Sequence, residues 1–165
     1  MIKQTLGALA LAAAFVVPLG SAHATDAGQP APAFDLPGTA GAVKLADLKG
    51  KVVYVDFWAS WCGPCKQSFP WMNEMQSKYG AQGLQIVGIT VDKKREDAEK
   101  FLAANPAKFT VAFDTVGDTP GKYSVKNMPT SYLIGADGKV VFVHGGFDDA
   151  AKAELEGKIK QALGK

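Results

Sequence analysis

Hydrophobic residues form two nearly continuous runs in the middle of the chain, at residues 52–58 and 84–91. Runs of this length are typical of strands that are buried on both faces of a sheet. Residues 34–36 and 43–45 instead alternate apolar and polar positions around glycine-rich turns. That alternation predicts a short hairpin of edge strands ahead of the two central strands.

Helical spacing separates and follows these runs. Apolar side chains after the first central run recur every three or four positions and predict a helix that ends near Tyr79, before Gly80. Asp92 is predicted to cap a helix over residues 93–105, and Asp148 a final helix with an apolar stripe. The remaining predicted elements are strands at residues 109–113, 130–134 and 139–143 and a short helix at residues 120–123. Together these elements predict one α/β domain over residues 34–165, with a central mixed sheet flanked by helices and an N-terminal hairpin extension.

The composition excludes several classes of protein. The 165 residues are 47% hydrophobic and 21% charged, which is typical of a globular domain with a substantial core. Eighteen basic residues nearly cancel sixteen acidic ones. There is no basic excess that would indicate a nucleic-acid partner, and no charge imbalance that would indicate disorder.

The first 24 residues have the form of a secretory signal. Lys3 precedes an apolar stretch of 14 residues at positions 6–19, and Ala22-His23-Ala24 fits the small-x-small cleavage pattern. We expect export by the general secretion route, because no twin arginine is present, and cleavage after Ala24. The alternative is an N-terminal membrane anchor, although a spanning helix needs about 20 apolar residues. Residues 25–33 are small, polar and proline-bearing, and are predicted to be a flexible tether.

The two cysteines of the chain stand three positions apart, in Trp61-Cys62-Gly63-Pro64-Cys65, directly after the first central run. A strand that leads a Cys-x-x-Cys onto a helix N-terminus places the sulfur where unpaired N–H groups and the helix dipole stabilise a thiolate. The first cysteine of such a turn is the more exposed one, so Cys62 is predicted to attack and Cys65 to resolve the mixed disulfide. Gly63 and Pro64 shape the turn.

Other interpretations of Cys-x-x-Cys lack the residues they need. Covalent haem attachment requires histidine after the second cysteine, where this chain has Lys66. A structural zinc site requires about four ligands. A purely structural disulfide would close too short a loop to remove much chain entropy. The sequence therefore indicates thiol–disulfide exchange without a metal or cofactor.

The segment from Val55 to Lys66, Val-Asp-Phe-Trp-Ala-Ser-Trp-Cys-Gly-Pro-Cys-Lys, resembles the active-site segment of thioredoxin. The wider pattern is similar to the exported TlpA/ResA-type proteins of the thioredoxin superfamily. The residues that carry this similarity are Pro32-x-Phe34-x-Leu36, Leu48-x-Gly50-Lys51-Val52-Val53, Phe69-Pro70, Met128-Pro129-Thr130 and Ile134-Gly135-Ala136-Asp137-Gly138. The resemblance covers about residues 30–146 and implies a thioredoxin fold.

The resemblance also implies roles for residues outside the turn. Pro129 matches the family's cis-proline, with Met128 offering backbone groups for strand addition by a partner. Asp56 matches the buried acid of thioredoxin and is a candidate proton acceptor for Cys65, with a pKa raised by its apolar strand. Trp61 is expected to contact partners. Lys66 either favours the thiolate or is a solvated helix residue.

The function predicted from these residues is a periplasmic thiol:disulfide oxidoreductase that acts mainly as a reductant of protein disulfides. It would be recharged by a membrane thiol carrier, work as a monomer, and serve cytochrome c maturation or other periplasmic thiols. An oxidant that installs disulfides would use the same residues. A thiol peroxidase is disfavoured, because Ala59 replaces the threonine of Thr-x-x-Cys and the one arginine is Arg95. A non-enzymatic metal-binding module is the remaining alternative.

Overall fold

The computed structural model describes residues 26–165, so the expected signal at residues 1–24 lies outside the described part of the chain. The core is a five-stranded sheet in the order β5-β4-β3-β6-β7. β3 (Val52–Trp58) pairs in parallel with β4 (Leu84–Thr90), which pairs in parallel with β5 (Thr110–Phe113). β6 (Thr130–Ile134) is antiparallel to β3 and to β7 (Val140–Gly145). The predicted mixed sheet is confirmed.

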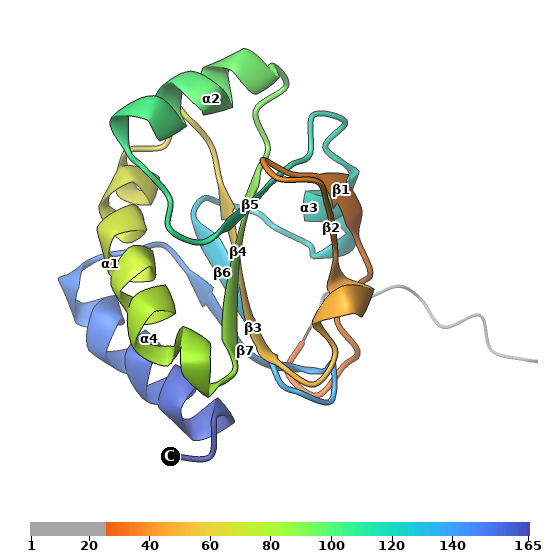
Figure 1. Ribbon diagram of the computed structural model, residues 1–165, viewed down its shortest axis with the longest axis vertical. Coiled ribbons are helices and arrows are strands. Elements are labelled where there is room, and N and C mark those ends of the chain that lie inside the picture. Colours follow the sequence, from red (N-terminus) through yellow and green to blue (C-terminus); the bar gives the residue numbers. More distant parts are fainter. Residues whose placement is uncertain (1–25) are drawn as a thin grey trace, which may run out of the picture.

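Helices and a hairpin cover the two faces of this sheet. The remaining elements are β1 (Asp35–Pro37), β2 (Ala42–Lys44), α1 (Gly63–Tyr79), α2 (Arg95–Ala104), α3 (Asp118–Lys122) and α4 (Asp149–Ala162), with 3₁₀ turns at Leu45–Leu48 and Gly80–Gln82. α1 and α4 lie on one side of the sheet, and the β1–β2 hairpin with α3 lies on the other (Figure 1). The N-terminal hairpin and the thioredoxin fold are therefore as expected.

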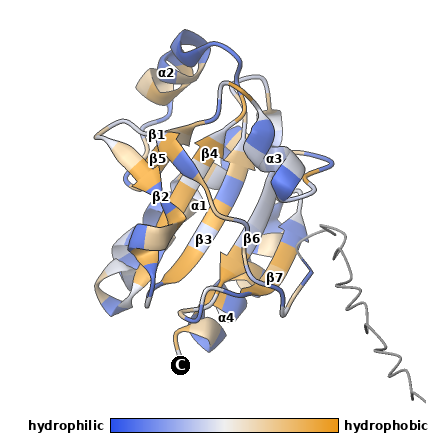
Figure 2. Ribbon diagram, turned by 90° about the vertical axis from the view of Figure 1, so that its right-hand side faces the viewer, coloured by the Kyte–Doolittle hydropathy of each residue, from blue (hydrophilic) through white to orange (hydrophobic). Residues whose placement is uncertain are grey.

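β3 supplies both halves of the core because its side chains alternate between the two faces of the sheet. Val53, Val55 and Phe57 pack on the side of the hairpin and α3, while Tyr54 and Trp58 pack on the side of α1 and α4. The strands are accordingly mainly hydrophobic in Figure 2, whereas α2 and α3 carry many hydrophilic positions. This double burial explains the nearly continuous apolar run in the sequence.

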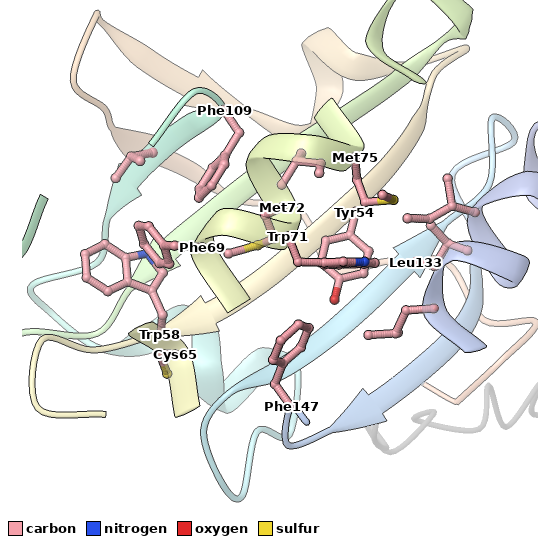
Figure 3. Close-up of a cluster of buried hydrophobic side chains, with 14 of the residues drawn as sticks. Tyr54, Trp58, Cys65, Phe69, Trp71, Met72, Met75, Phe109, Leu133 and Phe147 are labelled. Carbon is pink, nitrogen blue, oxygen red and sulfur yellow. The ribbon is translucent and has the colours of Figure 1, made fainter. Parts of the chain in front are cut away.

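An aromatic cluster lies between β3 and the helices that cover it (Figure 3). The ring of Trp58 lies 5.0 Å from that of Phe69 on α1 and 4.9 Å from that of Phe101 on α2. Phe69 also packs edge-on against Phe109, with ring centroids 5.2 Å apart. These ring contacts hold α1 against β3, and with it the segment of residues 59–65 that joins them, called the redox turn below.

Helix ends agree with the sequence predictions at two places and differ at a third. α1 ends at Tyr79, and the Asp148 carboxylate accepts a 2.9 Å hydrogen bond from the N–H of Ala151, as expected of a cap. The predicted cap at Asp92 is wrong. α2 begins at Arg95, and its N-cap residue, Lys94, makes no side-chain capping bond.

The segment that precedes the hairpin lies along the edge of the sheet. The N–H of Gly28 donates to the carbonyl of Val140 at 2.7 Å, and the N–H of Val140 donates to the carbonyl of Gln29 at 2.9 Å. Part of the expected tether is therefore paired with the start of β7. Over residues 26–165, none of the helices has the length and apolar character needed to cross a membrane.

Candidate redox site

The two cysteines lie at the start of α1 and form a disulfide. Cys62 is the N-cap residue of the helix, and its sulfur accepts a 3.2 Å hydrogen bond from the backbone N–H of Cys65. Cys62 is 5% exposed and Cys65 is fully buried. The N–H that now meets the Cys62 sulfur would stabilise a thiolate there after reduction.

The turn residues are arranged as the sequence indicated. Gly63 and Pro64 form the first turn of α1, where the missing N–H of proline costs no hydrogen bond. Lys66 is exposed, and its backbone N–H donates to the carbonyl of Cys62 at 3.4 Å. Trp61 is 71% exposed, which is unusual for the largest side chain and leaves an aromatic surface next to the sulfur.

The Met128–Pro129 peptide bond is cis. Thr130, which follows it, pairs with Phe57 near the end of β3, so the antiparallel register brings Pro129 to the edge of the sheet where the redox turn begins. Met128 is half-buried against the same core cluster that contains both cysteines. The sequence prediction of a cis-proline is confirmed, and its place beside the end of β3 fits a docking role.

Asp56 is a buried carboxylate on the cysteine side of the sheet. It lies on β3 between Tyr54 and Trp58, which pack in the cluster with Cys62 and Cys65, and it is 2% exposed. Its Oδ2 atom has no hydrogen-bond partner. Burial raises the pKa of Asp56 well above its ordinary value. A carboxyl group in this state can take up a proton near neutral pH.

A surface hollow of about 400 Å³ lies beside Cys62, between the redox turn and α2. Trp61 and Lys66 line it on the side of the turn, and Lys100 and Phe101 line it on the side of α2. Phe101 is anchored by its ring contacts with Trp58 and Phe69. The hollow therefore lies between the packed aromatic core and Cys62, and sequence reasoning did not foresee it.

Ser60 and Asp92 are a second feature that sequence reasoning missed. The backbone N–H and the hydroxyl of Ser60 each donate a 2.8 Å hydrogen bond to the carboxylate of Asp92. The two residues follow β3 and β4, and the carboxyl ends of parallel neighbouring strands meet at one edge of a sheet. That topological signal was available in the sequence, once the two strands were taken as neighbours.

The described residues offer little for other chemistry. Within residues 26–165 no group of three or more histidine, cysteine or acidic side chains is placed to hold a metal ion. The guanidinium of Arg95 stacks on the ring of Phe113, 4.1 Å from its centroid, rather than pairing with a cysteine. The feature that supports thiol–disulfide exchange is the Cys62–Cys65 disulfide itself, at the start of α1.

Comparison with known proteins identifies the family of the chain. Residues 27–143 match the AhpC/TSA family. The thiol-disulfide oxidoreductase ResA of Bacillus anthracis is 40% identical over 119 residues, which are 72% of this chain and 68% of that protein. A crystal structure assigned as the thiol:disulfide interchange protein DsbE from Chlorobium tepidum is 59% identical, with a TM-score of 0.84, over 85% of this chain and 99% of that one. A structure assigned as a protein disulfide isomerase from Bacteroides thetaiotaomicron is 27% identical, with a TM-score of 0.78, over 86% and 92% of the two chains. The chain belongs to the AhpC/TSA family of the thioredoxin superfamily and is a thiol-disulfide oxidoreductase.

Proposed function

We propose that this chain is an exported oxidoreductase that reduces the disulfides of other proteins in the periplasm. The observation that carries the exchange chemistry of this proposal is the unequal placement of the two sulfurs. Cys62 reaches the surface beside the exposed Trp61, whereas Cys65 is fully buried behind it. A partner protein can therefore meet only the Cys62 sulfur, and Cys65 is left to complete the exchange from inside.

The reaction follows from these positions. In the reduced protein the Cys62 thiolate attacks one sulfur of the partner disulfide, forming a mixed disulfide and releasing the other partner sulfur as a thiolate. Cys65 then loses its proton to Asp56 and attacks the Cys62 sulfur. The partner leaves as its second thiolate and is protonated, and the 62–65 disulfide remains. Two electrons pass to the partner, so the cycle closes only when a thiol donor returns two electrons and two protons.

Docking of the partner chain would use the edge of the sheet around the turn. Backbone groups at Met128 stand next to the cis-proline Pro129, where an extended segment can pair by strand addition without regard to its sequence. Trp61 offers an apolar face, and the hollow between the turn and α2 offers room for side chains next to the partner's cysteine. These features suit many different protein disulfides.

Electron flow from this protein to its partners is supported by the Gly63-Pro64 pair, which resembles that of reducing thioredoxins. The donor would be a membrane thiol carrier, because cytoplasmic reductases do not reach an exported protein. Apocytochrome c, whose cysteines must be reduced before haem attachment, is the partner class that the TlpA/ResA likeness favours. The structural neighbours include proteins named for thiol:disulfide interchange, which agrees with the exchange step.

Trapping tests the exchange mechanism. Cys65→Ser, expressed in the native host, should remain disulfide-linked to its partners, because nothing resolves the bond to Cys62. Cys62→Ser with Cys65 intact is the matched control and should capture nothing. Mass spectrometry of the linked species would identify the partners. Equal capture by the two variants, or none by Cys65→Ser, would contradict the assigned roles.

The direction of electron flow and the cellular location of the protein need separate measurements. Equilibration of the purified domain with glutathione buffers should give a potential below that of the glutathione couple. A potential above it would instead assign the protein as a disulfide-forming oxidant. Cell fractionation should recover the protein from the periplasm with Thr25 as its first residue, and an intact N-terminus in the membrane fraction would favour the anchor.

A further inference from the structure

Asp92 stands at the end of β4 with its carboxylate directed at the redox turn. Its Oδ1 atom accepts the hydroxyl hydrogen of Ser60, and its Oδ2 atom accepts the backbone N–H of Ser60 and the hydroxyl hydrogen of Thr90, each at 2.8 Å. The residue is 5% exposed. Three hydrogen bonds hold this nearly buried carboxylate in one position. The exchange reaction described above gives it no role.

Ser60 belongs to the turn that delivers the attacking sulfur. The N–H of Cys62 donates to the carbonyl of Ala59 at 3.1 Å, so Ser60 and Trp61 are the two central residues of a four-residue turn. The turn leaves β3 at Trp58, and Ser60 links it to the end of β4, 32 residues later in the chain. We propose that Asp92 positions Cys62 through Ser60, and that its negative charge disfavours the Cys62 thiolate and so poises the dithiol as an electron donor.

The positioning part follows from what Ser60 would lose. Without the carboxylate, the part-buried N–H of Ser60 would have no acceptor, and leaving a buried donor unpaired is unfavourable. The turn would relieve that cost by moving toward water. Since Trp61 and Cys62 follow directly, both the aromatic surface and the sulfur would move with it.

The electrostatic part follows from the short chain path between Ser60 and Cys62. The Asp92 carboxylate lies 2.8 Å from the Ser60 nitrogen. Cys62 is two residues further on, at ~3.8 Å or less per Cα–Cα step in a turn, so we take a separation on the order of 8 Å. At that separation, and at an effective dielectric constant between about 20 and 80, a unit charge shifts a pKa by roughly 0.4 to 1.5 units. Other charged groups lie on the elements around the turn: Asp56 on β3, Lys66 on α1, and Asp97 and Lys100 on α2 across the hollow. Removing the Asp92 charge while these other groups stay in place should therefore lower the pKa of Cys62.

The redox consequence rests on the proposed function as a reductant. Reduction of the 62–65 disulfide takes up two electrons and two protons and yields two thiols, of which Cys62 ionises as the pH rises. A charge that disfavours this thiolate raises the free energy of the reduced state. The oxidised state is then preferred, and the pair gives up its electrons more readily.

Asp92→Asn tests the electrostatic part, because the asparagine oxygen can still accept the Ser60 N–H while the charge is gone. The pKa of Cys62, measured from thiolate absorbance of the reduced protein, should fall by about 0.4 to 1.5 units. The equilibrium with glutathione at pH 8 should shift toward the reduced protein by roughly three- to thirtyfold, the same change expressed as a ratio. A pKa of Cys62 that is unchanged or higher would overturn the proposal.

Asp114→Asn is the matched control. Asp114 is also a buried acid at a strand end and accepts backbone N–H groups, from Gly117 and Thr119, but its loop leads to α3 and not to the cysteines. This variant should lose stability without any change in the pKa of Cys62. Equal shifts in the two variants would show a general effect of destabilisation and would refute the specific role of Asp92.

Ser60→Ala tests positioning and remains usable if Asp92→Asn does not fold. It removes one of the two bonds and leaves the charge, so the rate constant per thiolate with a protein disulfide should fall several-fold while the pKa of Cys62 moves little. Ser60→Thr keeps the hydroxyl and should restore the rate; an unchanged rate in Ser60→Ala would refute the positioning role. Each variant is compared with the unsubstituted protein. The test of Asp92 and Ser60 therefore stands even if the potential of the unsubstituted protein shows that it is an oxidant and not a reductant.

Discussion

Replacing Asp56 by asparagine should change how the stability of the protein depends on pH. Burial raises the pKa of this carboxyl well above the value of 3.8 that it has in a solvated chain. Between 3.8 and the folded-state pKa, the folded protein therefore binds a proton that the unfolded chain has released. Folding stability falls as the pH rises through that window, because ionising the group inside the core is unfavourable. Asp56→Asn removes the titration.

The magnitude follows from the count of one proton. The difference in unfolding free energy between the variant and the original should grow by about 1.4 kcal/mol for each pH unit in the window and level off above the folded pKa. The variant should also have a free energy of unfolding that is lower by a constant of about 1–3 kcal/mol at every pH. The reason is that Oδ2 has no hydrogen-bond partner, so the new amide N–H₂ would be unpaired there. The slope, and not the offset, is the diagnostic quantity.

Urea unfolding followed by tryptophan fluorescence, from about pH 4.5 to 8, would measure both proteins. The disulfide should be kept intact, so that neither cysteine titrates. Other ionisable groups are common to the two proteins and cancel in the difference. A flat difference curve, or one that falls with pH, would refute the conclusion that Asp56 is held in an unfavourable environment for its charge.

Three further predictions concern the turn and the core that supports it. Trp61→Ala should lower kcat/KM for a protein disulfide by about tenfold, as loss of an aromatic contact does, and leave the reaction with a small aromatic disulfide unchanged. Because the side chain is 71% exposed, the free energy of unfolding should change by less than about 0.5 kcal/mol. An equal loss of kcat/KM with both substrates would argue against a docking role. Phe69→Ala should cost about 3–5 kcal/mol in urea unfolding, since the ring is 1% exposed and packs on Trp58, Phe101 and Phe109. Asp148→Ala should cost about 1 kcal/mol through loss of the cap on α4, and a variant as stable as the original would contradict the capping bond.

The sequence was most informative where a local pattern has a local cause. The run at residues 52–58 alternates its side chains between two apolar faces and therefore predicts a central strand, which is what β3 is. Asp148 caps the helix that begins at the next residue by accepting from the N–H three residues on, and the cap needs nothing from the rest of the fold. The place of the cysteines at a strand-to-helix turn was predictable for the same reason, since the turn is made by consecutive residues.

Asp92 shows where such reasoning stops. An aspartate before a polar segment resembles a helix cap in the sequence. In the structure, however, the Asp92 carboxylate accepts hydrogen bonds from Ser60, 32 residues earlier, and from Thr90. The energy of this contact depends on which strands are neighbours, and propensities do not carry that information. The hollow beside Cys62 is likewise formed between α1 and α2, whose separation is set by the packing of Phe69, Phe101 and Trp58.

The electrostatics around the turn bear on the direction of electron flow. The start of α1 and the Cys65 N–H favour a thiolate on Cys62, and in the most oxidising proteins of this kind a strongly stabilised thiolate holds the reduced form. Two carboxylates would oppose that effect by adding negative charge near the turn: Asp56 on the cysteine side of β3, when it is ionised, and Asp92 at the end of β4. Asp56→Asn and Asp92→Asn should therefore both raise the potential. Only Asp56→Asn should also slow the release of the partner, because Asp56 alone is assigned the proton of Cys65. A potential that falls in either variant would mean that the carboxylates stabilise the reduced protein, and the argument for an electron donor would fail on the charges themselves.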